Sequence, residues 1–421
     1  MMDHVSWIEY IAAALFFLAL IHTFSAKYFV KLAQRESRHA GAWLMLGEVE
    51  VVFGFWAFIL LGFMAVVNGY EKAVEYMDTR DFTEPLFVFV ILVIAGTRPI
   101  LQAAQLLIDL LAKVIPLPGT ITYYFLTLTV VPLLGSFITE PAAMTLAAII
   151  LRDRYFSKKI PETMKYLTIA VLFVNVSIGG VLTSYAAPPV LMVASKWGWG
   201  MDFMLMTFGW KAALAVSVNA LIASWVFRKI LVGMDDLKDD YEIGRVPPLV
   251  MLIHMTTLVL VVIFSHHPFV FMGFFLFFLG FTEAYHRYQS SLMLREGLLV
   301  AFFLAGLVVL GGMQKWWLSP ILSGLDSHTL FGGATLLTAI TDNAALTYLG
   351  SLVDGLSDAS KYALVAGAIT GGGLTVIANA PNPVCFSLLK NHFEHQSINP
   401  LMLFLYALPP TIIAACSFLL L

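Results

Sequence analysis

Long apolar stretches, separated by short polar segments, follow one another along the whole chain. Most of them reach roughly 20 residues, the length that an α-helix needs to cross the hydrocarbon core of a bilayer. They lack the alternation of apolar and polar positions that marks a membrane β-barrel. The pattern predicts an all-α polytopic membrane protein of about 11 transmembrane segments.

The charges of the polar segments predict which side of the membrane each segment faces. Lys27, Lys31, Arg35 and Arg38 follow the first apolar stretch, and short loops rich in Lys and Arg stay in the cytoplasm. The N-terminus is therefore predicted outside, and counting the later spans places the C-terminus outside as well. The predicted full spans are about 7–24, 42–67, 86–111, 203–227, 248–264, 269–285, 297–313 and 401–421.

Two further apolar segments begin and end on the same side of the membrane by this count. Residues 119–151 lie between Lys113 and a strongly basic segment, 152–165, so both of their ends face the cytoplasm. They are too few for two spans of ~20 residues and a turn. We predict a re-entrant hairpin with its tip near 137–141, and the same count predicts a second hairpin, entering from the outer side, at 329–353.

Two motifs occur twice and in the same order. Ile-Thr-Glu-Pro-Ala-Ala-Met-Thr at 138–145 and Ile-Thr-Asp-Asn-Ala-Ala-Leu-Thr at 340–347 share a Thr, an acid, two Ala and a second Thr. Each is followed by Gly-Gly-x-Leu-Thr-x-x-Ala-x-x-Pro, at 179–189 and at 371–381. Such matches rarely arise by chance in an apolar chain, so we infer an internal duplication. Because the two hairpins have opposite senses, the fold predicted is one of inverted repeats, the architecture of secondary transporters.

The second motif interrupts a long apolar stretch in each repeat. Residues 164–195 and 361–389 contain these interruptions, and Gly and Pro at mid-depth break the hydrogen-bond ladder of a helix. We predict two discontinuous helices; the alternative is that the Gly pairs only allow helices to pack closely. The helix-breaking positions are Gly179, Gly180, Pro189, Gly371, Gly372 and Pro381.

These segments divide the chain into four regions. Residues 1–84 are predicted to form N-terminal scaffold spans, and 85–230 form repeat 1 with the hairpin 119–151 and the broken helix 164–195. A cytoplasmic linker and central scaffold spans occupy 231–296. Residues 297–421 form repeat 2 with the hairpin 329–353 and the broken helix 361–389.

Composition agrees with a membrane protein and excludes other classes. The chain is 60% hydrophobic and 12% charged, with a mean hydropathy of +0.86, more apolar surface than a water-soluble body can bury. A net charge of -3 without a basic cluster argues against nucleic-acid binding. No pattern typical of a catalytic nucleophile, a metal quartet or a nucleotide-binding loop occurs, so we predict no enzyme and no cofactor. Cys385 and Cys416 are predicted to be small core residues.

At the hairpin tips the chain resembles a known superfamily. Two hairpins of opposite sense, each followed by a Gly-broken helix, are similar to the ion transporter superfamily, which includes sodium/proton antiporters, arsenite and citrate carriers and dicarboxylate carriers. The tips, 136–143 and 339–345, resemble most the putative sodium/proton antiporter family within it. The resemblance covers roughly 85–230 and 297–421. Dicarboxylate carriers have Ser-Asn-Thr triplets where this chain has Thr-Glu-Pro and Thr-Asp-Asn, a difference that disfavours a dicarboxylate substrate.

The resemblance implies a function and an assembly. It implies an antiporter that exchanges sodium for protons by alternating access, with the sodium ion and the proton as transported species. It also implies a homodimer with an elevator-like motion, embedded in the lipid bilayer of a bacterial-type inner (plasma) membrane.

The paired acidic residues at the tips suggest how such an exchange works. A carboxylate near the middle of a bilayer is costly, so it is usually there to bind an ion, a proton or a partner charge. Carboxylates with Thr and Asn oxygens form the hard-oxygen cage that a small alkali cation prefers, and removal from water favours the protonated carboxyl group when the cation is absent. The alternative is that the two acids cap half-helix N-termini. The candidate ion- and proton-binding residues are Glu140, Asp342, Thr139, Thr341, Asn343 and Asn379, with the two carboxylates as sodium ligands.

Two basic residues inside predicted spans leave other functions open. Lys211 is a possible charge partner of a site carboxylate or a side chain that reaches the outer surface. Arg98 is predicted to pair with a carboxylate, and Glu48 and Glu50 are the candidates. A purely structural ion pair is the simplest interpretation. A cavity-facing cation would suit the alternative function, a sodium- or proton-coupled carrier of an organic acid or oxyanion. A membrane scaffold protein would need no site at all.

Overall fold

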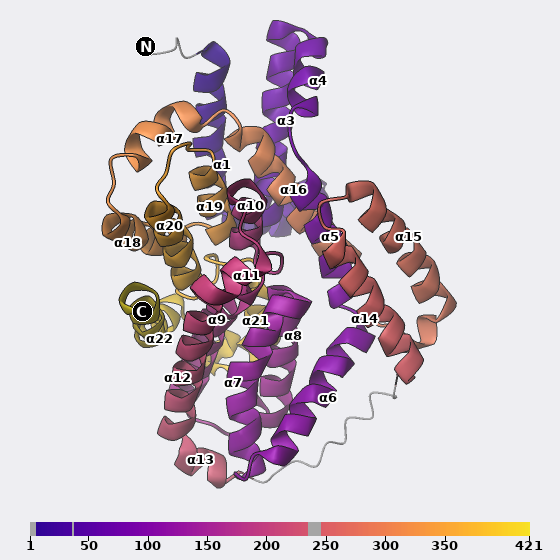
Figure 1. Cartoon of the computed structure of the whole chain (residues 1–421), viewed down its shortest axis with the longest axis vertical. Coiled ribbons are helices and arrows are strands. Elements are labelled where there is room, and N and C mark those ends of the chain that lie inside the picture. The colour runs from indigo at the N-terminus through magenta and orange to yellow at the C-terminus, as the bar shows by residue number, and fades with distance from the viewer. Residues whose placement is uncertain (1–5, 36–37, 235–245) are drawn as a thin grey trace.

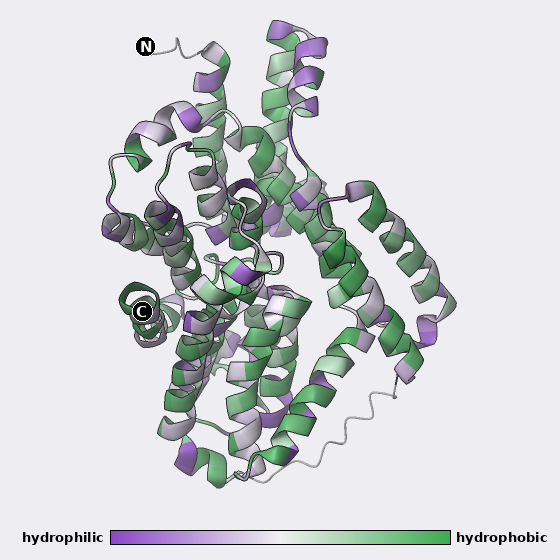
Figure 2. Cartoon of the chain, in the orientation of Figure 1, coloured by the Kyte–Doolittle hydropathy of each residue, from purple (hydrophilic) through white to green (hydrophobic). Residues whose placement is uncertain are grey.

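The computed structural model describes residues 6–35, 38–234 and 246–421, and within these ranges the secondary structure is helical throughout. Most helices are hydrophobic along their length, and hydrophilic residues gather at helix ends and in connecting segments (Figure 2). Residues 235–245 of the predicted cytoplasmic linker lie outside the described residues, as do 1–5 and 36–37 of the predicted N-terminal scaffold region.

Seven helical segments among the described residues are long and apolar enough to cross a membrane, or eight if one bent pair counts as a single span. The chain is therefore a polytopic helical membrane protein. The expectation of about 11 segments stays a prediction, because several of the remaining apolar helices are shorter. The seven are 7–26, 49–68, 119–138, 162–182, 201–226, 294–311 and 400–420.

Two predicted spans are divided in the structure. The stretch 42–67 consists of α2 (Ala40–Leu46) and α3 (Val49–Asn68). The stretch 86–111 consists of α5 (Thr83–Ala95) and α6 (Arg98–Val114), which meet at an angle of 65°. Pro99 explains the bend, because it has no N–H for the helical ladder and its ring clashes with the carbonyl four residues before it.

Helices from the N-terminal and the central part of the chain pack against one another. Helices α1 (Trp7–Arg35), α3 and α16 (Leu294–Gly311) pack together, and α5 lies against α16. Their close approach depends on small residues: the backbone of α3 at Gly54 lies directly against Gly306. Helices α14 (Pro248–Ile263) and α15 (Pro268–Ala284) form a hairpin beside α5 (Figure 1). We call α1, α3, α5 and α14 to α16 the scaffold.

The first predicted hairpin is present as two antiparallel helices. Helix α7 (Gly119–Ile138) turns sharply at Thr139 into α8 (Glu140–Leu151). The rings of Tyr124 and Tyr155 are in contact at its open end, with centroids 5.4 Å apart, and a Cβ on Gly135 would lie 3.4 Å from that of Ala143 near the tip. Whether the hairpin is re-entrant stays a prediction. A π-helical turn, Arg152–Phe156, continues α8.

The segments that follow each tip are broken helices at the predicted places. In the first, α9 (Glu162–Gly179) continues into a short turn, Gly180–Leu182, before α10 (Pro188–Trp197). In the second, α20 (Asp358–Gly371) stops ten residues before α21 (Asn382–Leu389). The remaining helices are α4 (Tyr70–Asp78), α11 (Met201–Met204), α12 (Trp210–Val226), α13 (Arg228–Val232), α17 (Lys315–Leu322), α18 (Ser327–Thr338), α19 (Asn343–Ser351) and α22 (Pro400–Leu420).

The two halves of the molecule pack against each other through their tips and broken helices. The second helix of each tip packs on the second half of the other repeat's broken helix: α8 on α21, and α19 on α10. A hydrogen bond also recurs in both halves. Thr183 Oγ1 donates to the Ser136 carbonyl at 2.6 Å, and Thr375 Oγ1 donates to the Ala339 carbonyl at 2.8 Å. Each break is therefore anchored to the tip of its own repeat.

A buried amide network joins α7, α9, α12 and α22. Pro132 lies inside α7 and cannot donate to the carbonyl of Leu128. Asn175 Nδ2 takes its place, donating to Leu128 O at 2.7 Å and to Val216 O at 3.1 Å. Asn219 Nδ2 in turn donates to Asn175 Oδ1 at 2.9 Å. The side chain of Asn175 therefore satisfies a carbonyl that the helix itself leaves free.

We expect Asn175→Ala to destabilise the protein by about 1–3 kcal/mol, because buried carbonyls lose their donor. Thermal unfolding of the purified protein in detergent measures this. Ser217→Ala is the matched control, since the Ser217 hydroxyl donates to Ala213 O of its own helix. Equal midpoints for the two variants would contradict the assigned role of Asn175.

Candidate functional site

The two broken helices meet at their breaks. Ser177 Oγ, near the end of α9, donates to Ile369 O, near the end of α20, at 2.7 Å. Beyond that bond, Gly372 lies against the side chain of Ser177, and Gly373 lies against Val174. The start of the second break therefore lies against the last turns of α9, and most residues of both breaks are at least partly buried.

Glu140 lies at this crossing, as the first residue of α8. It is 0% exposed. Its Oε2 accepts a hydrogen bond of 2.8 Å from Asn379 Nδ2, from the second break. Its Oε1 has no hydrogen-bond partner among the described residues. A carboxylate removed from water in this way needs a cation or a proton, because a single amide donor does not replace its hydration.

The backbone at Thr139 aims Glu140 into the interior. Thr139 has φ 73 and ψ 151, a conformation that is uncommon for any residue except glycine and rare for a β-branched one. The residue is 1% exposed, and its hydroxyl has no partner among the described residues. Such strain at a tip is typical of functional sites.

Asp342 has a different environment from Glu140. Its Oδ1 accepts from Ala344 N at 2.8 Å and from Ala345 N at 3.1 Å, so it caps α19. The capping role left open by the sequence is therefore present for Asp342. Asp342 also lines a cavity, whereas the Glu140 side chain is fully buried.

Several neutral side chains complete the surroundings. The Asn343 backbone N–H donates to Ala378 O at 3.2 Å, which ties the second tip to the second break. Thr341 Oγ1 donates to Leu337 O at 2.8 Å and its residue lines the cavity of Asp342. Within the six candidate residues, the buried polar atoms that have no hydrogen-bond partner among the described residues are Thr139 Oγ1, Glu140 Oε1, Asn343 Oδ1 and Nδ2, and Asn379 Oδ1.

Two adjoining cavities reach the tips. The Asp342 cavity, of about 250 Å³, is lined by Thr341, Asp342 and Asn379. The Thr139 cavity, of about 550 Å³, is lined by Thr139 and Pro141. A single cage built by the acids of both tips would need one shared pocket, whereas the two tips line separate cavities with a common wall. Their shared lining residues are Glu48, Glu50, Val300, Ala380 and Pro383.

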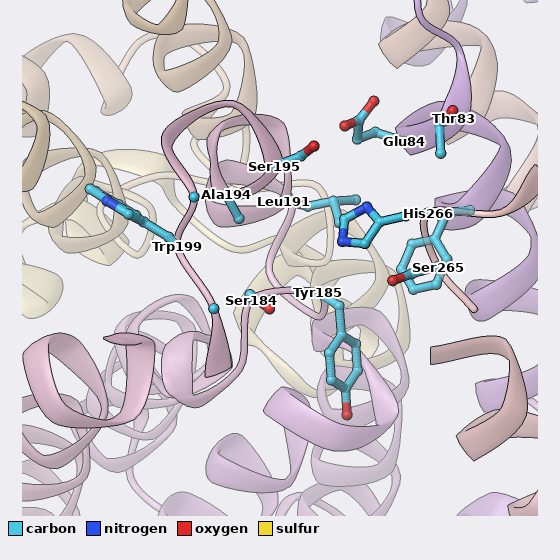
Figure 3. Close-up of a pocket in the computed structure, with 13 residues that line it drawn as sticks. Thr83, Glu84, Ser184, Tyr185, Leu191, Ala194, Ser195, Trp199, Ser265 and His266 are labelled. Atoms are coloured by element: carbon cyan, nitrogen blue, oxygen red, sulfur yellow. The ribbon is translucent and has the colours of Figure 1, made fainter. Parts of the chain in front are cut away.

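A third cavity, the Glu84 pocket, lies on the other side of Tyr185 and has a volume of about 400 Å³. Glu84 comes from α5, His266 from the connection between α14 and α15, and Tyr185 from the first break (Figure 3). Tyr185 and Leu191 line both this pocket and the Thr139 cavity. These two side chains therefore form the partition between the two spaces.

The candidate charge partners lie away from the tips. Lys211 Nζ donates to the hydroxyl of Tyr362 on α20 at 2.9 Å, and it also lies over the Tyr362 ring. Arg98 begins α6, just after the bend between α5 and α6. Glu48, one of its two guessed partners, instead accepts from Arg295 Nη2 at 2.6 Å.

The side chains that hydrogen-bond to free backbone groups at the breaks were not predicted from the sequence. Ser136 Oγ donates to Gly179 O at 2.7 Å and accepts from Leu182 N at 2.9 Å. Asn382 Nδ2 donates to Gly372 O and to Thr375 O, both at 2.8 Å. The position of Asn382 between two prolines, next to a broken helix, was the available signal.

The two glycines of each pair have different roles. A Cβ on Gly179 would lie 2.7 Å from Pro132 O, and Gly371 lies against the backbone of Thr335, so the first glycine allows close helix packing. A Cβ on Gly180 would lie 2.5 Å from Glu140 Oε1, and one on Gly372 would lie 2.9 Å from Asn343 Nδ2. The second glycine leaves room for polar groups of the site. Both interpretations of the pairs therefore apply, each to one residue. Pro189 and Pro381 lie at the start of α10 and just before α21.

We expect Gly180→Ala and Gly179→Ala to separate these roles. Gly180→Ala displaces a side-chain carboxylate and should change ion binding at Glu140 while the thermal midpoint stays near that of the wild type. Gly179→Ala meets a fixed backbone and should lower the midpoint. Thermal unfolding and sodium-dependent stabilisation, measured on both variants, test this. A loss of stability in Gly180→Ala as large as in Gly179→Ala would contradict the separation.

Comparison with known families gives one finding over nearly the whole chain. Residues 7–421 match the family described as "Putative Na+/H+ antiporter". The match includes the N-terminal and central scaffold helices, which the resemblance at the tips does not cover. Among curated proteins, the comparison finds no match.

Proposed function

Because the chain belongs to the family described as "Putative Na+/H+ antiporter", we propose that it exchanges sodium for protons across the membrane by alternating access. Glu140 and Asp342 are the groups that bind either species in turn. Thr139, Thr341, Asn343 and Asn379 supply neutral oxygen ligands for sodium. The transported species are the sodium ion and the proton.

The buried carboxylate of Glu140 is the observation that carries this proposal. One of its oxygens is held by Asn379, and the other has no partner among the described residues. Oxygens of Thr139 and Asn379 without partners add ligands of the kind that alkali cations prefer. When sodium leaves, the same carboxylate is stabilised by a proton instead. Competition of the two species for one group couples their movements.

Asp342 extends the site toward the Asp342 cavity. Asn379 links the two acids, because its side chain bonds Glu140 and its residue lines the cavity with Asp342. The capping bonds to Asp342 use backbone N–H groups, and these bonds can coexist with a bound cation, which is held by the negative charge of the same carboxylate.

The cavities support a relative movement of two units. Their walls come from the tips and breaks on one side, with Thr139, Asp342 and Asn379, and from α3 and α16 of the scaffold on the other, with Glu50 and Val300. We propose that 119–197 and 327–389 move as one transport unit against the scaffold. The inverted repeats, with regions 1–84, 85–230, 231–296 and 297–421, the homodimer and the bacterial-type inner membrane remain part of this proposal.

The second candidate function is a coupled carrier of an organic acid or oxyanion. Arg295 lines the Thr139 cavity and is the cation that such a carrier would use. Its guanidinium is bonded to Glu48, however, and Lys211 is bonded to Tyr362. The charges of the tips themselves are negative, which favours a cation as the substrate.

We expect Asp342→Asn to abolish sodium-dependent proton flux while the protein stays folded. Asn is as good an N-cap as Asp, so the variant keeps the cap of α19 and removes the charge. The measurement is pH-dye fluorescence of proteoliposomes after a sodium jump. Asp326→Asn is the matched control, since Asp326 caps α18 by the same pattern of bonds on an exposed surface. Undiminished exchange in Asp342→Asn would leave Asp342 a structural cap only.

Glu140→Gln should abolish the same flux, because the amide keeps an acceptor for Asn379 but cannot exchange a proton for sodium. Sodium-driven proton flux and uptake of labelled organic acids are measured side by side. Saturable uptake of an acid without any sodium-driven proton flux in the wild type would reject the antiporter in favour of the carrier.

A further inference from the structure

Glu50 lies at the interface between the scaffold and the tips. It belongs to the first turn of α3 and is partly exposed. It lines both the Asp342 cavity and the Thr139 cavity. It lies outside both repeated motifs.

Glu50 differs from its neighbour Glu48, which lines the same two cavities. Glu48 is neutralised by Arg295 at 2.6 Å. Among the described residues, Glu50 has no such ion pair. Of the two scaffold carboxylates in this wall, Glu50 is therefore the one whose charge is available to a ligand.

The opposite wall of the Asp342 cavity supplies a second carboxylate and a neutral oxygen. Asp342 and Glu50 line the same cavity. Asn379 also lines it, is 1% exposed, and has an Oδ1 without a hydrogen-bond partner among the described residues. Two carboxylates around a cavity of about 250 Å³ repel each other, and a cation between them removes the repulsion.

We propose that Glu50 is a cation-binding residue of the scaffold, which together with Asp342 and Asn379 holds an alkali cation in the Asp342 cavity. The inference rests on the proposed sodium/proton exchange and extends its ion path beyond the hairpin tips. A carboxylate pair with an amide oxygen has the hard-oxygen chemistry of an alkali cation site. No proton transfer is required of Glu50 in this role.

The proposed site is built from the scaffold and the transport unit together, and this gives it a function in the transport cycle. Glu50 is carried by the scaffold, and Asp342 and Asn379 are carried by the transport unit. The three groups are together only while the second tip lies against α3. Glu50 therefore receives the ion from the tip, or delivers it, on one side of the membrane, and it raises the local cation concentration at that cavity.

Glu50→Gln in the full-length protein tests this. We expect the half-saturating sodium concentration for exchange to rise about tenfold, the effect of losing roughly 1.4 kcal/mol of cation binding, with a much smaller change in maximal rate. Glu50→Asp, which keeps the charge, should recover most of the affinity. Glu71→Gln, on the exposed surface of α4, is the control for removal of a negative charge.

A second readout does not depend on transport. Sodium chloride should raise the thermal midpoint of the wild-type protein relative to choline chloride, and Glu50→Gln should reduce this shift. Exchange in the wild type with unchanged sodium dependence in Glu50→Gln would overturn the role of Glu50 and leave the antiporter intact. If the wild type shows no exchange, the proposed antiport function is rejected, but the thermal midpoints still test the cation site. Equal sodium-dependent shifts of the midpoint in the wild type and in Glu50→Gln would overturn that site.

Discussion

The hydrogen bond between Glu140 and Asn379 is the interaction on which the site depends. It joins the first tip to the second break, so it requires both halves of the chain to be in place. A fully buried carboxylate with one amide donor is costly in the absence of a proton or a cation. The surrounding structure maintains it: Thr139 adopts an unusual backbone conformation, and Gly180 leaves the space that the carboxylate occupies.

The fold solves a problem that any broken helix creates inside a membrane protein. Each break frees backbone groups that water cannot reach. Ser136 satisfies the end of α9, Asn382 satisfies the segment after α20, and Asn175 serves the carbonyl that Pro132 leaves free in α7. Among the residues of the tips and the second break, buried polar atoms of Thr139, Asn343 and Asn379 have no hydrogen-bond partner among the described residues. These atoms are available to a ligand.

The two tips are similar in sequence and different in environment. Glu140 is sealed at the crossing of the breaks, whereas Asp342 caps α19 and lines a cavity against the scaffold. In the proposed exchange this asymmetry gives the acids consecutive positions on one path, with Asn379 between them. A Pro follows Glu140 where Asn343 follows Asp342, so the second repeat supplies the amides of both Asn343 and Asn379 to the centre.

The sequence by itself determined the membrane class and the places where the two helices are interrupted, because apolar length, Gly and Pro act locally and need no tertiary partner. It did not determine the pairing of Glu48 with Arg295 or the bond of Lys211 to Tyr362. Those depend on which surfaces meet. Only the tertiary structure decided that Asn379 binds Glu140 and that Asp342 and Glu50 line one cavity, since these residues lie far apart in the chain. Their distances are set by how the two halves pack, and hydropathy and motif spacing contain no record of that packing.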